Sequence, residues 1–292
     1  MRSLVLASVI LVAACGAETV SYNVATPIFP EADAPTAFTR AYSMTESRDG
    51  LIRGNAKEDG DYTRLWAVRK QEDGSWSEPQ TLDFPSRITL TTPSFSAADG
   101  TLYYASDADI LDRGQRDLNI WRVEPTAKGW GEPECLPASI NDGARNFNPA
   151  MDASGRLYFT PDGYDSIGGH DIFEAALDAE TGDWVVSMMP DGVNSPKAEG
   201  HLAVTPDGNR MFFYSHRAPK YGVVDIWTMT RGADGNWQTP NNLGEPVNTA
   251  GIDFGAGLSG DGSRLFFSRE GELMIIDLEV ALAGEGSVPD AQ

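Results

Sequence analysis

Basic residues, histidine and cysteine are all scarce in this chain. Its 292 residues include 22 lysines and arginines against 43 aspartates and glutamates, which gives a formal net charge of −21. Nucleic-acid binding needs a basic surface, and so does electrostatic adhesion to anionic lipid. The charge therefore argues against both kinds of partner. An acidic surface also promotes solubility, and this is the simpler explanation of the charge.

Histidine-based metal sites and the common serine-hydrolase motif are also missing from the sequence. The three histidines, His170, His201 and His216, do not have metal-ligand spacing. The segment 257–261 reads GLSGD, so it lacks the final glycine of a G-x-S-x-G nucleophile elbow. We therefore expect no metal site of this type, no cofactor and no hydrolase domain of that class.

Several aspartates lie close together between residues 107 and 117. They are Asp107, Asp109, Asp112 and Asp117. Their spacing does not follow the alternating oxygen ligands and closing glutamate of an EF-hand loop. The sequence leaves calcium binding open here, and a solvated acidic loop is the simpler interpretation.

No apolar run approaches the roughly 20 residues of a membrane-spanning helix. The most apolar run, from Leu4 to Ala14, follows one arginine and precedes Cys15. This pattern predicts a secretory signal peptide over residues 1–14. The tetrapeptide at 12–15, VAAC, resembles the lipobox of bacterial lipoproteins. In that family the cysteine is diacylated and becomes the mature N-terminus. An ordinary signal peptide with an incidental cysteine is the alternative.

The lipoprotein resemblance has consequences for location and for the second cysteine. Gly16 stands where an aspartate would favour the inner membrane, so we expect an anchor in the outer membrane, facing the periplasm. A tether over 15–23 would keep the domain within about 30 Å of the bilayer. If Cys15 carries lipid, Cys135 has no disulfide partner in the chain. We expect Cys135 to be an inert thiol on an outer strand, and a reactive thiol is the alternative.

Tryptophan is confined to two positions of a repeat about 54 residues long. One series is Trp76, Trp130, Trp184 and Trp237, and the second is Trp66, Trp121 and Trp227, with Phe173 in its gap. Turn pairs recur at the same period: Asp49-Gly50, Asp99-Gly100, Ser154-Gly155, Asp207-Gly208 and Asp261-Gly262. Self-similarity at this period predicts a β-propeller, in which the tryptophans pack between blades.

The unit from Glu199 to Thr249 shows the expected blade. Short runs at 201–205, 210–215, 224–230 and 237–243 predict four strands, with tight turns at Asp207-Gly208 and Asp234-Gly235. The other units have matching strands and no helical periodicity, which predicts an all-β protein.

The last unit ends after Leu278 without a fourth strand. Thr26 precedes the turn residue Asp49 by 23 residues, and Thr239 precedes the turn residue Asp261 by 22 residues. The segment Val24 to Phe29 is therefore predicted to be the missing strand, which would close the ring and remove its open edge. Five turn pairs predict five blades over residues 24–282, followed by a flexible tail over 283–292.

Four segments carry a resemblance to a known family. They are TPDGNRMFFYS, GGHDIFEA, VDIWTM and NWQTPNNLGEPVNT. The chain resembles the WD40-like repeats of TolB-type bacterial propellers over nearly its whole mature length. The first unit departs most, with GLIRGNAKED at its second strand. The resemblance implies an envelope propeller that acts through protein contacts or peptidoglycan-associated assemblies. It does not identify a partner.

The entries to the predicted inner strands carry the candidate site. Counting back from each turn glycine brings five polar residues to one end of the predicted channel: Asn146, Asn148, Glu199, His201 and Asp253. We expect them to form a rim that binds a partner or that only supports the loops. The alternative function is a glycoside hydrolase, since two carboxylates can flank a glycosidic bond; Glu199 and Asp253 would then act. We expect a lipid-anchored, monomeric, non-catalytic scaffold for a protein or glycan.

Overall fold

The structure is a computed structural model. It describes residues 21–29, 43–47, 50–54, 63–69, 71, 76–87, 89–108, 117–141, 145–162, 166–190 and 192–287. The predicted signal peptide, Cys15, and Asp109 and Asp112 of the acidic loop lie outside these ranges. Within them, no helix is both long enough and apolar enough to span a bilayer.

The described strands form five four-stranded antiparallel sheets and one short ribbon. Sheet 1 contains β2 (Ser43–Ser47), β3 (Gly50–Gly54), β4 (Leu65–Val68) and β5 (Gln80–Thr81). Sheet 2 contains β6 (Leu90–Phe95), β7 (Leu102–Ser106), β8 (Asn119–Val123) and β11 (Glu134–Cys135). The ribbon pairs β9 (Pro125–Thr126) with β10 (Gly129–Trp130). The segment at 50–59, which differs most from the TolB-type repeat, still begins with the second strand of its sheet, β3.

The remaining sheets repeat this order. Sheet 3 contains β12 (Arg145–Met151), β13 (Leu157–Asp162), β14 (Phe173–Leu177) and β15 (Trp184–Met188). Sheet 4 contains β16 (Glu199–Val204), β17 (Arg210–Ser215), β18 (Asp225–Thr230) and β19 (Asn241–Asn242). Sheet 5 contains β20 (Asp253–Leu258), β21 (Arg264–Arg269), β22 (Glu272–Asp277) and β1 (Thr26–Pro27).

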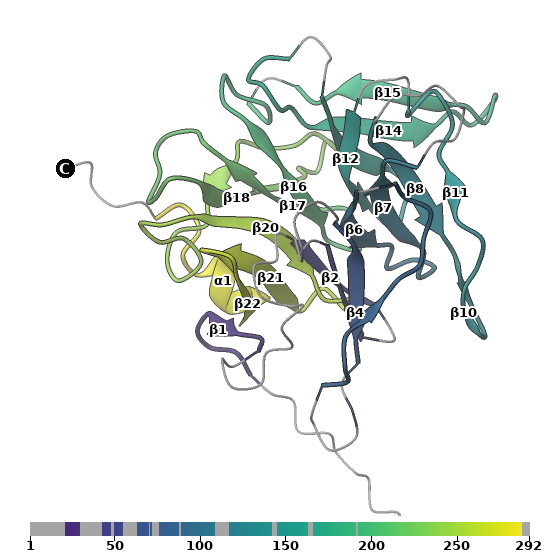
Figure 1. The fold of residues 1–292 in the computed structure, drawn as a ribbon. Coiled ribbons are helices and arrows are strands. Elements are labelled where there is room, and N and C mark those ends of the chain that lie inside the picture. Colours follow the sequence, from purple (N-terminus) through teal and green to yellow (C-terminus); the bar gives the residue numbers. More distant parts are fainter. Residues whose placement is uncertain are drawn as a thin grey trace, which may run out of the picture.

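The sheets have a β-propeller arrangement, with the first strand of each sheet toward a common centre (Figure 1). In that layer β2 contacts β6, β6 contacts β12, β12 contacts β16, β16 contacts β20, and β20 contacts β2. A cavity of about 40 Å³ between these strands is lined by Met44, Ser94, Met151, Leu202 and Ala256, among others. A cavity of this size admits water but no larger ligand.

The outer strand of sheet 5 comes from the other end of the domain. Strand β1 pairs with β22, with Thr26 opposite Ile275 and Pro27 opposite Met274 (Figure 1). This confirms the pairing that the Thr-Pro spacing predicts. The pairing covers an edge of β22 that would otherwise be open to another chain.

The segment after β22 differs from the expectation. A short helix, α1 (Leu278–Leu282), follows directly, although the sequence showed no helical period there. Residues 283–287, assigned to a flexible tail, are held against sheet 4. Arg210 Nη1 lies 2.8 Å from Glu285 Oε2, and Gly286 N donates to Asn242 O at 2.8 Å. These five residues thus contact sheet 4 through a partly buried ion pair and a backbone hydrogen bond.

The aromatic series fills the spaces between sheets, as predicted. Trp227, at 4% exposed, packs in one cluster with Tyr158 of sheet 3 and Phe213 of its own sheet. Trp121 and Phe173 are almost as deeply buried. Buried aromatic rings contribute the largest apolar area per residue, so these positions stabilise the contact between neighbouring sheets.

Candidate functional site

Four inner strands share one irregularity near their N-terminal ends. The pairing register shifts between Thr91 and Ser94, Phe147 and Ala150, Gly200 and Ala203, and Phe254 and Gly257. At each shift one residue has a positive φ: 47° at Thr92, 55° at Asn148, 47° at His201 and 73° at Gly255. We call these four residues the bulge layer. Left-handed backbone is costly for residues other than glycine, so such positions are candidates for function.

The bulge layer corrects one alignment made by counting back from the turns. Asn148 lies seven residues before its turn glycine, and the same count back from Gly100 reaches Pro93, whereas the residue with the positive φ is Thr92. The turn between β6 and β7 covers 96–101, and the turn between β12 and β13 covers only 152–156. The extra residue in the first turn shifted the count by one.

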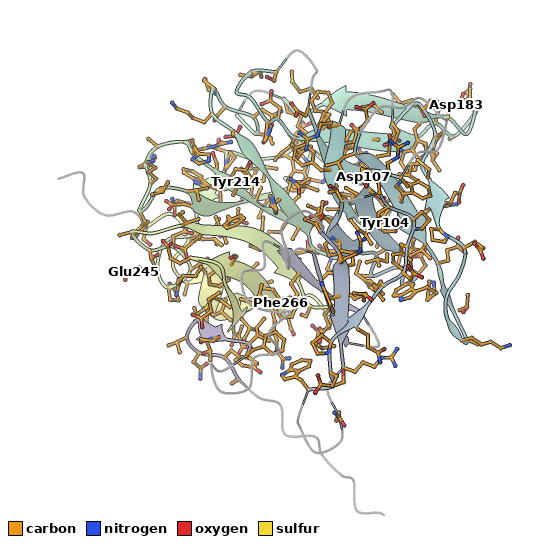
Figure 2. All side chains as sticks on the ribbon, viewed as in Figure 1. Tyr104, Asp107, Asp183, Tyr214, Glu245 and Phe266 are labelled. Atoms are coloured by element: carbon orange, nitrogen blue, oxygen red, sulfur yellow. The ribbon has the colours of Figure 1, made fainter. Side chains whose placement is uncertain are left out.

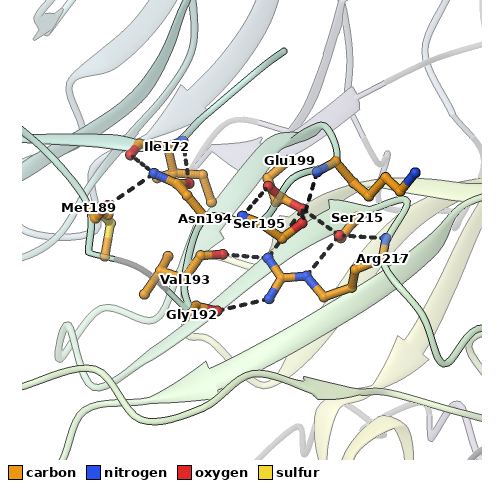
Figure 3. A network of polar contacts seen from close by, with 10 residues as sticks. Ile172, Met189, Gly192, Val193, Asn194, Ser195, Glu199, Ser215 and Arg217 are labelled. Carbon is orange, nitrogen blue, oxygen red and sulfur yellow. Dashed lines mark hydrogen bonds and ion pairs between the residues drawn. The ribbon is translucent and has the colours of Figure 1, made fainter. Parts of the chain in front are cut away.

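Glu199 is fully buried rather than exposed on a rim. Its Oε1 accepts hydrogen bonds from Ser195 Oγ at 2.7 Å and Ser215 Oγ at 2.6 Å, and its Oε2 accepts from Ser195 N at 3.0 Å. Arg217 Nη2 lies 3.2 Å from the same Oε1 (Figure 3). The carboxylate thus joins β16, β17 and the loop before β16.

Arg217 extends this network to the loop backbone. Its Nη1 donates to Gly192 O at 2.9 Å and its Nη2 donates to Val193 O (Figure 3). The guanidinium carbon also lies 5.4 Å from the ring centres of Phe213 and Trp227. The ion pair therefore fixes the loop that enters the inner strand.

Asp253 repeats this arrangement in sheet 5. It is fully buried, and its Oδ2 accepts from Thr249 N and Thr249 Oγ1, both at 2.7 Å. Arg269 Nε donates to Oδ1 at 2.8 Å, and Arg269 Nη2 donates to Val247 O at 2.7 Å. Asn146, at the corresponding position of sheet 3, is fully buried as well. Four of the five predicted rim residues thus lie inside the protein, since Asn148 is 3% exposed, and only His201 is partly exposed.

A second set of buried amides was missed by the sequence reasoning. Asn141, Asn194 and Asn248 each accept a hydrogen bond at 2.8 Å, from the backbone N of Ile120, Ile172 and Ile226 respectively. Each amide nitrogen donates to the carbonyl of the same isoleucine. The recurring pairs Ile140-Asn141, Val193-Asn194 and Val247-Asn248 were a signal in the sequence. They clamp the third strands of sheets 2, 3 and 4 near their N-terminal ends.

All three histidines gather around one tyrosine at the bulge layer. His170 Nδ1 lies 3.4 Å from Tyr214 Oη, and the rings of His201 and His216 lie 5.7 and 5.8 Å from the ring of Tyr214. Figure 2 labels Tyr214 on β17. Their sequence spacing gave no sign of this, because they come from three separate segments.

Two phenylalanines extend this group of rings. The ring of Phe147 lies 5.3 Å from His170, and the ring of Phe254 lies 5.6 Å from His201. We call the six residues Phe147, His170, His201, Tyr214, His216 and Phe254 the ring patch. His216 is exposed and the other five are partly exposed. The patch spans sheets 3, 4 and 5.

Burial controls the charge of the two central rings. Burial, together with a smaller contribution from the nearby His170, lowers the pKa of His201 to about 4. It also raises the pKa of Tyr214 to about 12, with Glu199 acting in the same direction. Both side chains are therefore uncharged near neutral pH, and the centre of the patch is polar without carrying charge.

Polar atoms at this level have no hydrogen-bond partner within the described part of the chain. They are Asn148 Oδ1 and Nδ2, Thr160 Oγ1, His201 Nδ1 and Ser268 Oγ. Thr160 and Ser268 lie on the second strands, opposite Phe147 and Phe254. The unpartnered atoms therefore belong to the same layer as the rings.

Two other candidates from the sequence, Asp107 and Cys135, show no sign of a functional role. Asp107 Oδ1 accepts from Arg87 N at 2.8 Å and Thr89 N at 2.9 Å, so this aspartate holds a loop. Burial raises the pKa of Cys135 to about 12, which keeps its thiol protonated and unreactive. Among the described residues, no group of three His, Cys, Asp or Glu side chains is arranged to hold a metal ion.

No protein-family model and no curated protein matches the chain. Among solved structures it is similar to an α-L-arabinofuranosidase from Lactobacillus brevis, with a TM-score of 0.50 and 12% identity over 86% of this chain and 94% of that one. A GH43 endo-arabinanase from Bacillus licheniformis has a TM-score of 0.49 and 12% identity, over 84% and 95% of the two chains.

TolB from Acinetobacter baumannii is also similar. The TM-score is 0.45 and the identity 16%, over 84% of this chain and 52% of that one. The chain thus matches about half the length of that TolB structure. At these identities the likeness shows the fold alone.

Proposed function

We propose that the chain is a non-catalytic binding protein. In this proposal the five sheets are the blades of a five-bladed propeller closed by β1, and the ring patch is its binding surface. The observation that carries the proposal is the contrast within this layer: the carboxylates are fully buried in ion pairs, whereas one of the six rings is exposed and the other five are partly exposed. Exposed aromatic rings beside polar groups are typical of recognition sites.

Glycoside hydrolysis is the second candidate, and the names of the arabinofuranosidase and endo-arabinanase give a reason to consider it. Such an enzyme needs two carboxylates that reach the sugar. Glu199 and Asp253 have no exposed surface, and their oxygens already accept bonds from serine, threonine and arginine. A substrate would have to displace a buried ion pair to reach either of them, which is costly.

The location stays part of the proposal. Lipidation at Cys15 would hold the domain at the periplasmic face of the outer membrane, where an envelope protein or a peptidoglycan-associated glycan would be within reach. Replacing Cys15 with serine should move the protein from the membrane fraction to the soluble fraction and abolish labelling with an alkyne analogue of palmitate. Unchanged membrane association and labelling in the Cys15→Ser variant would contradict this part.

One assay separates binding from hydrolysis. We would incubate the purified protein with soluble arabinan, xylan and peptidoglycan fragments and measure new reducing ends over time. A binding protein releases none above the background of a heat-denatured sample. A hydrolase releases them, and the isosteric Glu199→Gln/Asp253→Asn variant, checked for folding by circular dichroism, releases far fewer. That second pattern would overturn the proposal.

A further inference from the structure

The outer strand of sheet 3 differs from the outer strands of the other four sheets. Strand β15 has five residues, whereas β1, β5, β11 and β19 have two each. In those four sheets a proline lies within the outer strand or directly before it: Pro27, Pro79, Pro133 and Pro240. Three residues after the tryptophan of the repeat, sheet 3 has Ser187 where sheets 1, 2 and 4 have proline. Short length and proline both protect a sheet edge from pairing, and β15 lacks both protections.

The free edge of β15 presents the backbone groups of three residues. Met189 N donates to Ile172 O at 3.0 Å, so Met189 points its backbone groups toward the neighbouring strand. This direction alternates along an antiparallel strand. The N–H and C=O groups of Trp184, Val186 and Met188 therefore point away from β14, and no strand of the described ranges pairs with them. They are available to an added strand.

The side chains along this edge are apolar and accessible. No residue of β15 is buried, and the strand contains no charged residue. Val185 is 58% exposed, and Leu177, which lies opposite Trp184 on β14, is 55% exposed. These two side chains flank the edge on opposite faces of the sheet, because their positions alternate along the ladder. Figure 1 shows β15 at the outer margin of the molecule. An added strand would thus find apolar contacts on both faces.

The turn that leads into β15 is acidic. Residues 178–183 connect β14 to β15 and include Asp178, Glu180 and Asp183. None of these carboxylates takes part in an ion pair within the described part of the chain. Glu180 and Asp183 are exposed, and Figure 2 shows Asp183 at the outer margin. Negative charge is therefore concentrated at the N-terminal end of the free edge.

This charge indicates which occupant fits the edge. A second copy of the chain would bring the same acidic turn and a net charge of −21, so it would be repelled, whereas a basic segment would be attracted. The strand pairs of sheet 3 are antiparallel, and a strand added in that direction would end beside the 178–183 turn. We propose that β15 binds an extended segment of a partner protein, in which alternating apolar residues precede lysine or arginine. This surface is separate from the ring patch, which has no residue on β14 or β15.

The test uses the full-length protein and three fluorescein-labelled probe peptides, TVTVTVKK, KKTVTVTV and TVTVTVEE. Fluorescence anisotropy in 50 mM salt, where surface charges are little screened, gives the dissociation constants. TVTVTVKK should bind saturably and at least about tenfold more tightly than TVTVTVEE. KKTVTVTV has the same charge as TVTVTVKK but places it at the wrong end, so it should bind about threefold more weakly or worse. That difference separates pairing at the edge from attraction to the acidic surface as a whole.

The decisive variant is Val186→Pro. It removes an N–H that points away from β14, so no bond inside the sheet is lost, and it should weaken binding of TVTVTVKK at least about tenfold. The matched control is Thr81→Pro on β5. Leu82 N donates to Leu65 O, so Thr81 also points its N–H away from its sheet, and this change should leave the affinity unchanged. Circular dichroism and thermal melting confirm that both variants fold.

A second variant tests the charge without changing the strand. Glu180→Lys/Asp183→Lys reverses two exposed charges of the turn and should weaken TVTVTVKK while strengthening TVTVTVEE, each at least about threefold. The matched control is Glu78→Lys/Asp83→Lys, which makes the same change in net charge at exposed positions beside β5. It should leave the order of the two affinities as in the wild type.

Each other result has a defined meaning. The inference is overturned if TVTVTVKK does not bind saturably, if KKTVTVTV binds equally well, or if Val186→Pro keeps the wild-type affinity. Equal effects of the two charge-reversed variants would show a response to overall charge alone, which also overturns it. A dimer in sedimentation velocity that Val186→Pro dissociates would identify a second copy as the occupant instead of a basic segment. All of these results leave the ring patch intact, so they do not decide the proposed function.

Discussion

Two positions on the same inner strand, two residues apart, have opposite hydrogen-bonding states. At the first, Glu199 and Asp253 are buried with every carboxylate oxygen bonded. At the second, Asn148 and His201 have left-handed backbones and atoms without partners among the described residues. The first position therefore has all of its polar groups satisfied by the fold, and the second does not. The predictions below test how much each of the two positions contributes to the stability of the fold.

The largest expected effect comes from removing a charge at the first position. Arg217→Ala should lower the free energy of unfolding by about 3–5 kcal/mol, because it leaves Glu199 buried without its cation. Urea unfolding measures this. The matched control is Arg122→Ala, whose pair with Glu134 is solvent-exposed, with side chains 38% and 61% accessible. That change should cost less than about 1 kcal/mol.

A double variant sharpens this result. Glu199→Gln/Arg217→Met removes both charges, so it should be clearly more stable than Arg217→Ala. Equal losses of unfolding free energy for Arg217→Ala and Arg122→Ala would show that the buried Glu199–Arg217 pair does not stabilise the loop before β16. The first position would then differ less from the second.

The second prediction compares two amides of similar burial. Asn194→Ala should cost about 2–3 kcal/mol, since it removes the partner of the Ile172 N–H and of the Met189 carbonyl, while the Ile172 carbonyl keeps its bond from Met189 N. Asn148→Gly should stay within about 1 kcal/mol of the wild type, because its side chain has no bonds within the described chain to lose. The same unfolding experiment measures both, and a larger loss for Asn148→Gly would show that its amide does make stabilising hydrogen bonds.

The sequence predicted much of the architecture, for physical reasons that particular residues show. Aromatic and turn residues repeat because every blade must bury the same faces, so the strand at Arg210–Ser215 was predicted with its observed bounds. The outer strand was predicted over 237–243 but covers only Asn241–Asn242. The length over which an edge strand pairs with its neighbour is hard to predict from its own sequence, because it depends on contacts with other parts of the protein.

The candidate site was predicted less well. Counting from the turns located the right end of the inner strands and included Asn148 and His201. It could not separate them from Glu199 and Asp253, because a polar residue type does not reveal its partners. Arg217 and Arg269, which bury the carboxylates, lie on the second strands or just after them, 18 and 16 positions away along the chain. The gathering of three histidines around Tyr214 depends on tertiary structure alone.

The smallest expected effect is a pH dependence that comes from His201. Burial lowers the pKa of His201 below the value of 6.5 that it has when unfolded. As the pH drops below 6.5, the unfolded chain binds a proton that the folded chain does not yet bind, so stability falls, and the loss is complete once the pH is below the folded pKa. The ring is partly exposed, so solvent limits this downward shift and keeps the difference in stability below about 1 kcal/mol. His201→Asn, which tolerates the left-handed φ, removes this titration. Thermal melts of both proteins from pH 7.5 to 4 should show the variant gaining on the wild type as the pH falls. A constant difference in melting temperature would mean that His201 titrates normally and that the bulge layer is more open to water than its neighbours indicate.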